Sequence, residues 1–274
     1  MIGFGQKTYI PDDNFEQRLI NLGYDNILDD SVITSNIDTV TYLNFNGLYG
    51  PIISDLTGIE DFSALTMLHS PNNQFTTLDL SGNTALTHLW CENNQLSSLD
   101  VSNNTALEHL DCVNNQLSSL DVSNNPALTM LWCQDNNLTA LDVNGATALN
   151  ELRCKINQLT SLDLSGNTAL TYLRCDQNPN LTSLNLRNGN NMNFTYFNAI
   201  SLTLPCISVD DSSWFSNNFS WGIHGSQHFS NNCSGVQVDG CTDAYACNYD
   251  ANANTNDGSC VYPSTSTITI TACD

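Results

Sequence analysis

The side chains best suited to binding gather at a few spaced positions in the middle of the chain. Two of the four tryptophans, three of the five histidines and three of the six basic residues stand there. Trp, Tyr, Met and Arg are enriched in the cores of protein interfaces. We therefore predict a ligand-binding surface made of His69, His88, Trp90, His109, Met130, Trp132, Glu151, Arg153, Lys155, Tyr172, Arg174 and Tyr196.

The chemistry of this surface changes along the chain, because its histidines precede its basic residues. Arg153, Lys155 and Arg174 are suited to bind carboxylates, sulfate or an acidic protein patch. The histidines recur at consecutive repeats, so a surface metal site is one alternative, although His69 is offset from the other two. A second alternative is that the tryptophans only cover apolar surface beneath them.

A repeat of 21 residues must position these side chains. Leucine recurs at Leu68, Leu89, Leu110, Leu131, Leu152 and Leu173, cysteine at Cys91, Cys112, Cys133, Cys154 and Cys175, and asparagine at Asn73, Asn94, Asn115, Asn136, Asn157 and Asn178. Leu89 and Cys91 alternate with His88, Trp90 and Glu92, as in a short strand with one buried face. Coils stacked at roughly 4.8 Å would share one apolar core. The asparagines are interpreted as structural, because their amides can satisfy backbone groups where the chain turns.

The unit LxCxxNxLxxLDLSxNxAL resembles the leucine-rich repeat, with cysteine in a slot that usually holds leucine. The resemblance implies an α/β-type repeat solenoid that is mainly β with short turns. It implies a right-handed coil whose parallel strand ladder lies on the concave face, the usual ligand surface of the family. Secreted bacterial members of the internalin type add an N-terminal helical cap and a disulfide-containing C-terminal cap.

Five segments are expected along the chain. Residues 1–6 are interpreted as a signal-peptide remnant, residues 7–40 as the N-terminal cap and residues 41–209 as a solenoid of about eight coils. Residues 210–239 would form the C-terminal cap and residues 240–274 a small Cys-rich module. This module resembles those that precede a type IX secretion sorting domain, so we expect it to be truncated. In the N-terminal cap, Asp13 and Glu16 fit a capping box at the start of a helix.

The eleven cysteines fall into two groups. The five that repeat with the leucines are expected to be buried free thiols, because an odd number cannot pair completely and their Cβ vectors would run parallel. The other six are expected to form disulfides: Cys206, Cys233, Cys241, Cys247, Cys260 and Cys273. The resemblance to bacterial caps implies a Cys206–Cys233 bond, and the pairing of the last four stays open.

Two sets of oxygen ligands raise the question of cation binding. Asp250, Asn252, Asn254 and Asp257 approximate the alternation of a calcium loop, but an Asn-rich turn explains them equally well. Aspartate also repeats once per coil, at Asp79, Asp100, Asp121, Asp142 and Asp163. For this ladder, capping of its own turns is the favoured interpretation, and shared cations are the alternative. Calcium is thus the one cofactor considered, and no other cofactor is expected.

The charge balance narrows the function. A net charge of −22, from 28 acidic and 6 basic residues, argues against binding nucleic acid or an anionic membrane surface. The sequence contains no apolar run long enough to span a membrane. These features favour a secreted, monomeric, non-catalytic binding module or adhesin at the cell surface that recognises a protein or glycan. The alternatives are a structural spacer, an ice-binding surface of Thr and Ser, and a polysaccharide-acting enzyme, although no nucleophile-base set is visible.

Overall fold

The computed structural model describes residues 5–200, 204–225 and 227–233, with isolated positions at 239–240, 243, 246, 255–256 and 260–261. The chain divides into two compact units, Met1–Asn231 and Asn232–Asp274. In the second unit, the short strands β17 (Asp239–Gly240) and β18 (Thr255–Asn256) pair in parallel. The unit boundary therefore falls before position 239, where the sequence placed the end of the C-terminal cap.

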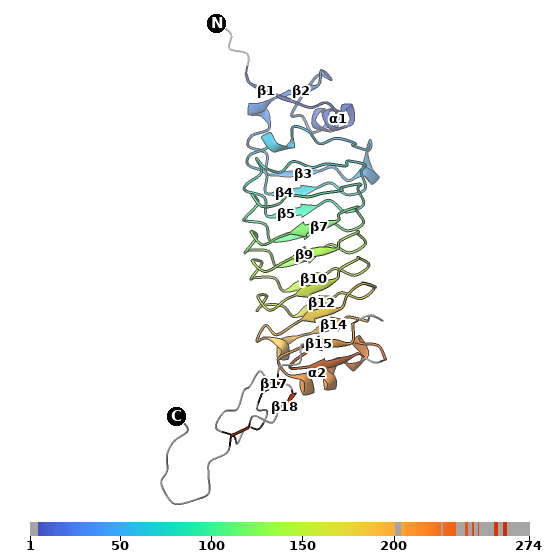
Figure 1. The fold of residues 1–274 in the computed structure, drawn as a ribbon. Coiled ribbons are helices and arrows are strands. Elements are labelled where there is room, and N and C mark those ends of the chain that lie inside the picture. The colour runs from blue at the N-terminus through green and yellow to red at the C-terminus, as the bar shows by residue number, and fades with distance from the viewer. Residues whose placement is uncertain are drawn as a thin grey trace, which may run out of the picture. The chain divides into compact units, whose positions relative to one another are not determined.

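The first unit is a stack of coils, each of which contributes one short strand to a parallel sheet (Figure 1). We call this sheet the main sheet, and within the described residues it has eight strands. They are β3 (Tyr42–Asn44), β4 (Met67–His69), β5 (His88–Trp90), β6 (His109–Asp111), β8 (Met130–Trp132), β10 (Glu151–Arg153), β12 (Tyr172–Arg174) and β14 (Tyr196–Asn198). The predicted parallel ladder is confirmed, and every pair is in register at the central Leu or Phe.

The inward side chains of this sheet are leucine and cysteine, as the repeat predicts. Leu89, Cys91 and their counterparts in the following coils are fully buried. All five repeating cysteines are free thiols, and burial raises their pKa well above the ordinary value. They act as small apolar side chains, because the reactive thiolate is strongly disfavoured in this environment.

A second set of parallel strands runs where the repeat reads LDLS. It comprises β7 (Ser119–Asp121), β9 (Ala140–Asp142), β11 (Ser161–Asp163), β13 (Ser183–Asn185), β15 (Cys206–Ser208) and β16 (His228–Ser230). β7 pairs with β9, and β11, β13, β15 and β16 form a separate sheet. Each strand turns one leucine, isoleucine or phenylalanine into the core between the two sets of strands.

The N-terminal cap consists of the antiparallel strands β1 (Lys7–Tyr9) and β2 (Ser31–Ile33) and the helix α1 (Asp13–Asn21). Phe15 of α1 packs against Phe45 at 5.3 Å between ring centroids. The predicted helix is confirmed, but its predicted capping box is wrong. Asp12 is the N-cap, and its carboxylate accepts from the backbone N–H groups of helix residues 14 and 15. Glu16 is buried and instead accepts from three backbone N–H groups at positions 29, 30 and 31.

The C-terminal cap is built around helix α2 (Ser212–Phe219), which covers the last coils (Figure 1). Phe215 packs between Phe197 and Phe229, with ring centroids 5.4 and 5.0 Å away. The predicted Cys206–Cys233 disulfide is confirmed, and Cys260 is also disulfide-bonded. Short 3₁₀ helices complete the fold: η1 (Thr34–Asn36), η2 (Gly47–Tyr49), η3 (Ile59–Asp61), η4 (Asn191–Asn193) and η5 (Ser220–Gly222).

Two ladders of buried asparagines join successive coils. In the predicted ladder, the Asn115 amide donates to the carbonyls of Cys91 and Cys112 at 3.0 and 3.1 Å and accepts from the Leu96 N–H at 3.0 Å. A second ladder, which the sequence analysis did not single out, consists of Asn83, Asn104, Asn125, Asn167 and Asn188. Their amides donate to carbonyls of the preceding coil, so both ladders supply hydrogen bonds to turns that lie away from water.

The residue before each asparagine of the first ladder adopts a left-handed backbone conformation. These residues are Asn72, Asn93, Asn114, Asp135, Ile156 and Gln177, with φ between 52° and 59°. Asn and Asp tolerate this region, whereas a β-branched side chain is strained there. Replacing Ile156 by Asn is therefore expected to raise the free energy of unfolding by about 1 kcal/mol. Urea unfolding measures this, with Asp135→Ile as the reciprocal control; an Ile156→Asn variant no more stable than the parent would contradict it.

Candidate functional site

The outer face of the main sheet carries two columns of side chains that point away from the core. The first column runs Met67, His88, His109, Met130, Glu151, Tyr172 and Tyr196. The second runs His69, Trp90, Asp111, Trp132, Arg153, Arg174 and Asn198. Of the predicted binding residues, all except Lys155 lie in these columns, and Lys155 is the second residue after strand β10.

Aromatic rings form a nearly continuous row across this face, which we call the aromatic strip. His69 and His88 contact Trp90 at 5.7 and 5.4 Å between ring centroids. His109 lies edge-on to both Trp90 and Trp132, at 5.3 and 5.1 Å. These ring pairs stabilise one another in addition to the area they bury. The strip is thus preorganised in this part of the sheet, since His109 contacts a tryptophan on each of the two neighbouring coils.

The rings cover one another, so the predicted binding residues are less exposed than expected. Trp90 and Trp132 are half-buried, and His109 is only 7% exposed. His109 is a support beneath the two tryptophans rather than an exposed ligand residue, because both large rings close over it. Burial is the main cause that lowers the pKa of His109, and the neighbouring His88 lowers it further, so the ring is neutral near pH 7.

The Arg153 guanidinium is already occupied by partners within the chain. Its Cζ lies 4.7 Å from the Trp132 ring centroid and 5.0 Å from that of Tyr172. The Glu151 carboxylate binds both the Arg153 Nε and the Trp132 Nε1, the latter at 2.9 Å. The Arg153 cation is therefore held between two aromatic rings and neutralised by the Glu151 carboxylate.

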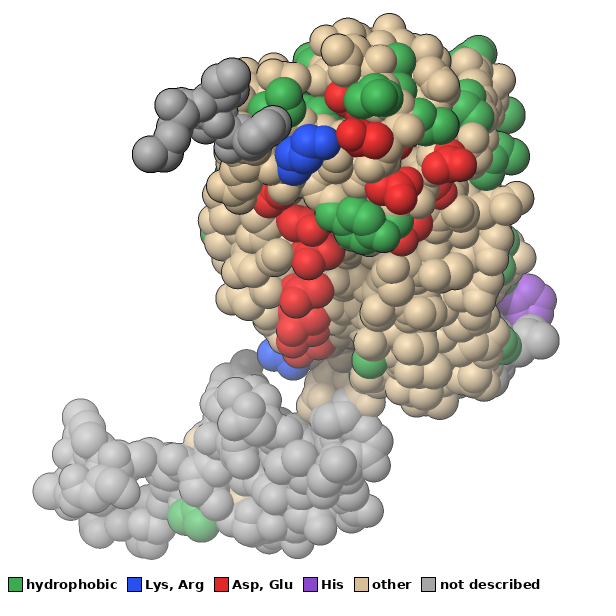
Figure 2. All heavy atoms as spheres, turned by 90° about the horizontal axis from the view of Figure 1, so that it is seen from above, with side chains coloured by type: hydrophobic (Ala, Val, Ile, Leu, Met, Phe, Trp, Pro, Cys, Tyr) green, Lys and Arg blue, Asp and Glu red, His purple; other side chains and the backbone are tan. Residues whose placement is uncertain are grey.

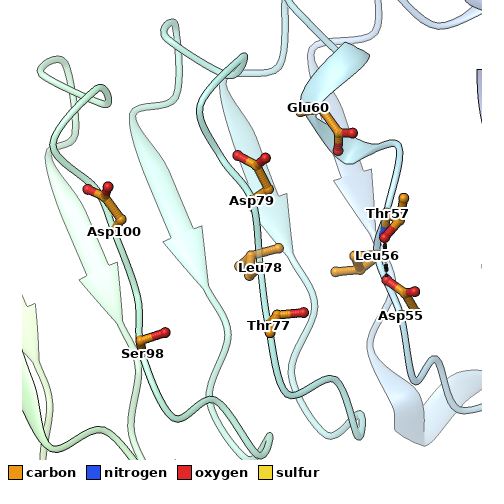
Figure 3. A pocket seen from close by; sticks show the side chains of 9 residues that line it. All are labelled: Asp55, Leu56, Thr57, Glu60, Thr77, Leu78, Asp79, Ser98 and Asp100. Atoms are coloured by element: carbon orange, nitrogen blue, oxygen red, sulfur yellow. Dashed lines mark hydrogen bonds between the residues drawn. The ribbon is translucent and has the colours of Figure 1, made fainter.

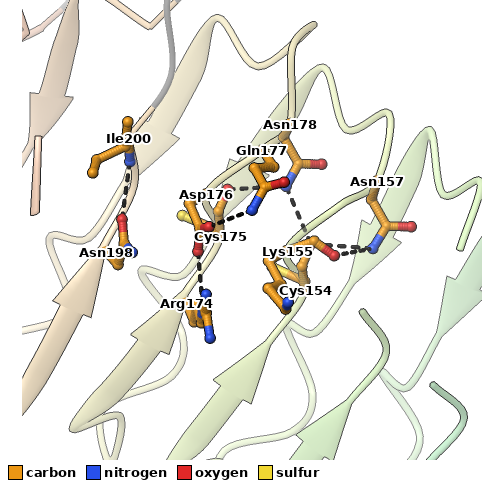
Figure 4. Close-up of polar contacts among 10 residues, drawn as sticks. All are labelled: Cys154, Lys155, Asn157, Arg174, Cys175, Asp176, Gln177, Asn178, Asn198 and Ile200. Carbon is orange, nitrogen blue, oxygen red and sulfur yellow. Dashed lines mark hydrogen bonds and ion pairs between the residues drawn. The ribbon is translucent and has the colours of Figure 1, made fainter. Parts of the chain in front are cut away.

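Arg174 is likewise neutralised by a carboxylate two residues further along the chain. Its Nε lies 2.9 Å from Asp176 Oδ1, and Gln177 donates to the other oxygen of the same carboxylate (Figure 4). The predicted basic cluster therefore offers less positive charge than the sequence suggested. Lys155 takes part in none of the ion pairs among the described residues. The face is not a strong site for anions.

Asp111 stands at the centre of the second column, between the two tryptophans. It is 7% exposed, and its Oδ1 accepts from the Val113 N–H at 3.1 Å. Burial raises the pKa of this carboxyl to about 7, and the charge of Glu92 adds to the effect. Burial also raises the pKa of Glu92. Two acidic groups are therefore held close together in a poorly solvated place, which costs stability unless a cation joins them.

The repeats match a known family model. Residues 105–146 match the model described as Leucine Rich repeats (2 copies). Internalin C2 from Listeria monocytogenes is 18% identical, with a TM-score of 0.60 over 84% of this chain and 100% of its own. The chain folds as a leucine-rich-repeat solenoid. No curated protein matches it.

Other solved leucine-rich-repeat structures are similar to this solenoid. An internalin (inlF) from Listeria monocytogenes is 20% identical, with a TM-score of 0.53 over 81% of this chain and 71% of its own. The functional domain of InlJ from the same bacterium, described as including a cysteine ladder, is 30% identical with a TM-score of 0.44. The match covers 79% of this chain and 56% of the InlJ domain.

The aspartate ladder of the solenoid caps its own turns, as predicted. Each carboxylate accepts from the backbone N–H two residues on, at 2.8 to 3.0 Å. The hydrogen bonds from Ser81 and Ser102 lower the pKa of Asp79 and Asp100. Viewed from the N-terminal end, acidic side chains gather in a row along the first unit (Figure 2). The aspartates of the ladder line up because the same Asp-capped turn recurs in each coil.

A hollow of about 420 Å³ lies along the first part of this ladder. Its acidic walls are Asp55, Glu60, Asp79 and Asp100, which come from three successive coils (Figure 3). Asp55 accepts from the Thr57 N–H and Oγ1, and Glu60 accepts from the Gly58 N–H. These carboxylates are engaged in local turns, and none of them demands an external ligand.

Several predicted ligands and cysteines lie outside the described residues of the solenoid and its C-terminal extension. They are the calcium candidates Asp250, Asn252, Asn254 and Asp257, and the cysteines Cys241, Cys247 and Cys273. Among the residues that are described, no group of three or more His, Cys, Asp or Glu side chains could hold a metal ion. The three histidines of the aromatic strip interact with tryptophan instead.

Two contributors to this face of the solenoid were missed by sequence reasoning. Trp221 in η5 is 54% exposed and extends the aromatic strip, since its ring lies 5.5 Å from Tyr196. It follows the last repeat, so no periodic signal marks it. Asp111 was not among the predicted binding residues, although the 21-residue period places it between two tryptophan positions, one coil away on either side.

Proposed function

We propose that this protein is an extracellular, non-catalytic binding module that recognises a partner protein through the outer face of the main sheet. The observation that carries the proposal is the aromatic strip, which spans coils from His69 to Trp221 and ends in an exposed tryptophan. Half-buried Trp, Tyr and Arg side chains that are locked by neighbours lose little conformational entropy on binding, which favours their use at interfaces.

Further features support an extracellular setting. The disulfides at Cys206, Cys233 and Cys260 suit an oxidising compartment. No helix among the described residues is long and apolar enough to cross a membrane. A glycan remains the alternative ligand, because tryptophan faces also stack on sugar rings.

The decisive experiment removes both tryptophans from the strip. A Trp90→Ala, Trp132→Ala variant is expected to lose at least about tenfold in affinity for the partner, because large central aromatic side chains dominate interface energy. A cell-surface pull-down and a glycan array, each with calcium and with chelator, provide the candidate partners. Surface plasmon resonance then measures the affinity of intact protein and variant.

The matched control is Tyr49→Ala, which removes an aromatic side chain that is 82% exposed and lies in η2, outside the strip. Circular dichroism must show that both variants are folded. Equal partner binding by the parent protein and the double tryptophan variant would overturn the proposal and favour a structural spacer. If chelator abolishes partner binding by the parent protein and by every variant, the binding site would instead be sought in the Cys-rich module of residues 240–274.

A further inference from the structure

Around Asp111, the outer face of the main sheet gathers acceptors without donors. Glu92 Oε2 and Gln134 Oε1 are buried atoms with no hydrogen-bond partner in the described structure. Glu92 and Gln134 follow the strands on either side of Asp111, so they are its diagonal neighbours. We call Trp90, Glu92, Asp111, Trp132 and Gln134 the Asp111 cluster. Unpartnered buried acceptors cost free energy, and a group that donates to them would recover it.

The central side chains of the cluster are short and its outer ones are long. Asp111 lies between Trp90 and Trp132 on the two neighbouring coils. Two residues further on, Val113 lies between Glu92 and Gln134. The floor includes His109, which is 7% exposed and whose Nε2 is also without a partner. The cluster therefore combines two aromatic rings with three oxygen acceptors on a polar floor.

The same face of the sheet already contains the filled version of such a cluster. Two coils beyond Asp111, the Arg153 guanidinium lies against Trp132 and Tyr172 and binds the Glu151 carboxylate. The Asp111 cluster has the aromatic rings and the carboxylates, but none of the ion pairs in the described chain includes Asp111 or Glu92. Arg153 attracts Asp111 from a distance without bonding to it.

We propose that the Asp111 cluster receives a lysine side chain from a basic segment of the partner protein, with the ammonium between Trp90 and Trp132. An ammonium has three donors, which match the acceptors of Asp111, Glu92 and Gln134. Its charge compensates the two neighbouring carboxylates, and the tryptophan rings add cation–π attraction. A neutral sugar could donate hydrogen bonds but could not compensate this charge.

The charge of the whole chain favours the same partner. With a net charge of −22, the protein attracts basic segments and repels acidic ones over several ångströms. Long-range attraction alone would not select one place, because acidic residues are spread along the chain. Selectivity comes from the cluster, where the carboxylates are flanked by aromatic rings.

This inference rests on the proposed function, because it specifies the partner chemistry at the same surface. The test uses two peptides, acetyl-Gly-Gly-Lys-Gly-Gly-amide and its counterpart with an acetylated lysine side chain. NMR monitors the indole N–H signals of the intact protein as each peptide is added. The lysine peptide is expected to shift the Trp90 and Trp132 signals in a saturable way, and the acetylated peptide to leave them unchanged.

At pH 8, where both carboxylates are charged, the variants Asp111→Asn and Asp121→Asn remove the same charge from different places. Asp121 caps a turn in β7, and asparagine retains its acceptor oxygen, so its variant controls for general electrostatic attraction. Asp111→Asn is expected to weaken lysine-peptide binding by about tenfold, and Asp121→Asn to change it less than twofold.

Three results would overturn the inference. They are equal binding of the acetylated peptide, equal losses in the two variants, and indole shifts produced by an oligosaccharide but not by the lysine peptide. Failure of this inference is distinguishable from failure of the proposed function. If the lysine peptide does not bind but the double tryptophan variant still loses the partner, the surface is correct and the assigned partner chemistry is wrong.

Discussion

Replacing Asn136 by Ala is expected to lower the free energy of unfolding by about 3–5 kcal/mol. The Asn136 amide donates to the carbonyls of Cys112, Cys133 and Gln134, at 3.0, 3.2 and 3.3 Å. Its Oδ1 accepts from the Leu117 N–H at 3.0 Å. Asn136 is 7% exposed, so water cannot replace these bonds without opening the turn. Each buried group left without a partner costs about 1–3 kcal/mol.

The measurement is urea unfolding followed by circular dichroism, with Asn137→Ala as the matched control. Asn137 is the next residue and is exposed, and its backbone N–H bond to Leu117 survives the substitution. The control is expected to change stability by less than about 0.5 kcal/mol. Because each coil contacts only its neighbours, the loss at one coil can split the transition into two steps. Similar unfolding midpoints for the two variants would show that the ladder is not a structural requirement.

The 21-residue period was enough to predict most of the first unit, because every coil repeats the same pattern of inward leucine and cysteine. Leu89 and Cys91 specify one coil, and their repetition specifies the stack. The period could not specify details that depend on a single site. Asp12, not Asp13, caps helix α1, because Asp12 also accepts hydrogen bonds from Ser54 and Asp55, which are distant in sequence.

The candidate surface also combines features that the period predicts with features that depend on a single site. Its outward residues follow from strand alternation, but the burial of His109 depends on the rings that neighbouring coils bring over it. One feature was readable and was missed. Residues two apart on a strand share a face, so Glu151 was placed to neutralise Arg153. The same local spacing joins Arg174 to Asp176. Two of the three residues of the predicted basic cluster are neutralised for this reason.

Replacing Asp111 by Asn is expected to stabilise the protein, and to do so more strongly as the pH rises. The pKa of this carboxyl is about 7 in the folded protein, against an ordinary value of 3.8. The folded state therefore binds more protons than the unfolded state between these two values, and its stability falls as the pH rises through that window. Above pH 7 the whole cost of the buried carboxylate is present.

The expected gain at pH 8 is up to about 4 kcal/mol, and roughly 2 kcal/mol at pH 5. The charged groups that act on the pKa of Asp111 are Glu92 on one neighbouring coil and Arg153 further along the sheet, and the titratable His109 lies on the same strand. Glu92 acts in the same direction as burial, and Arg153 opposes it. His109 is neutral near pH 7, so it does not offset the carboxylate.

Thermal unfolding at pH 5 and pH 8 measures the effect, with Asp121→Asn as the control. Hydrogen bonds from Ser123 lower the pKa of Asp121 below its ordinary value, so that carboxylate is charged at both pH values and its replacement is expected to destabilise the protein slightly and equally at pH 5 and pH 8. An Asp111→Asn variant that is less stable than the parent at pH 8 would show that the carboxylate is well solvated or already paired. A carboxylate kept at a cost to stability is explained by a function that needs its charge, as lysine binding does. Stability gained and lysine-peptide affinity lost in one variant would then be two consequences of the same buried carboxylate.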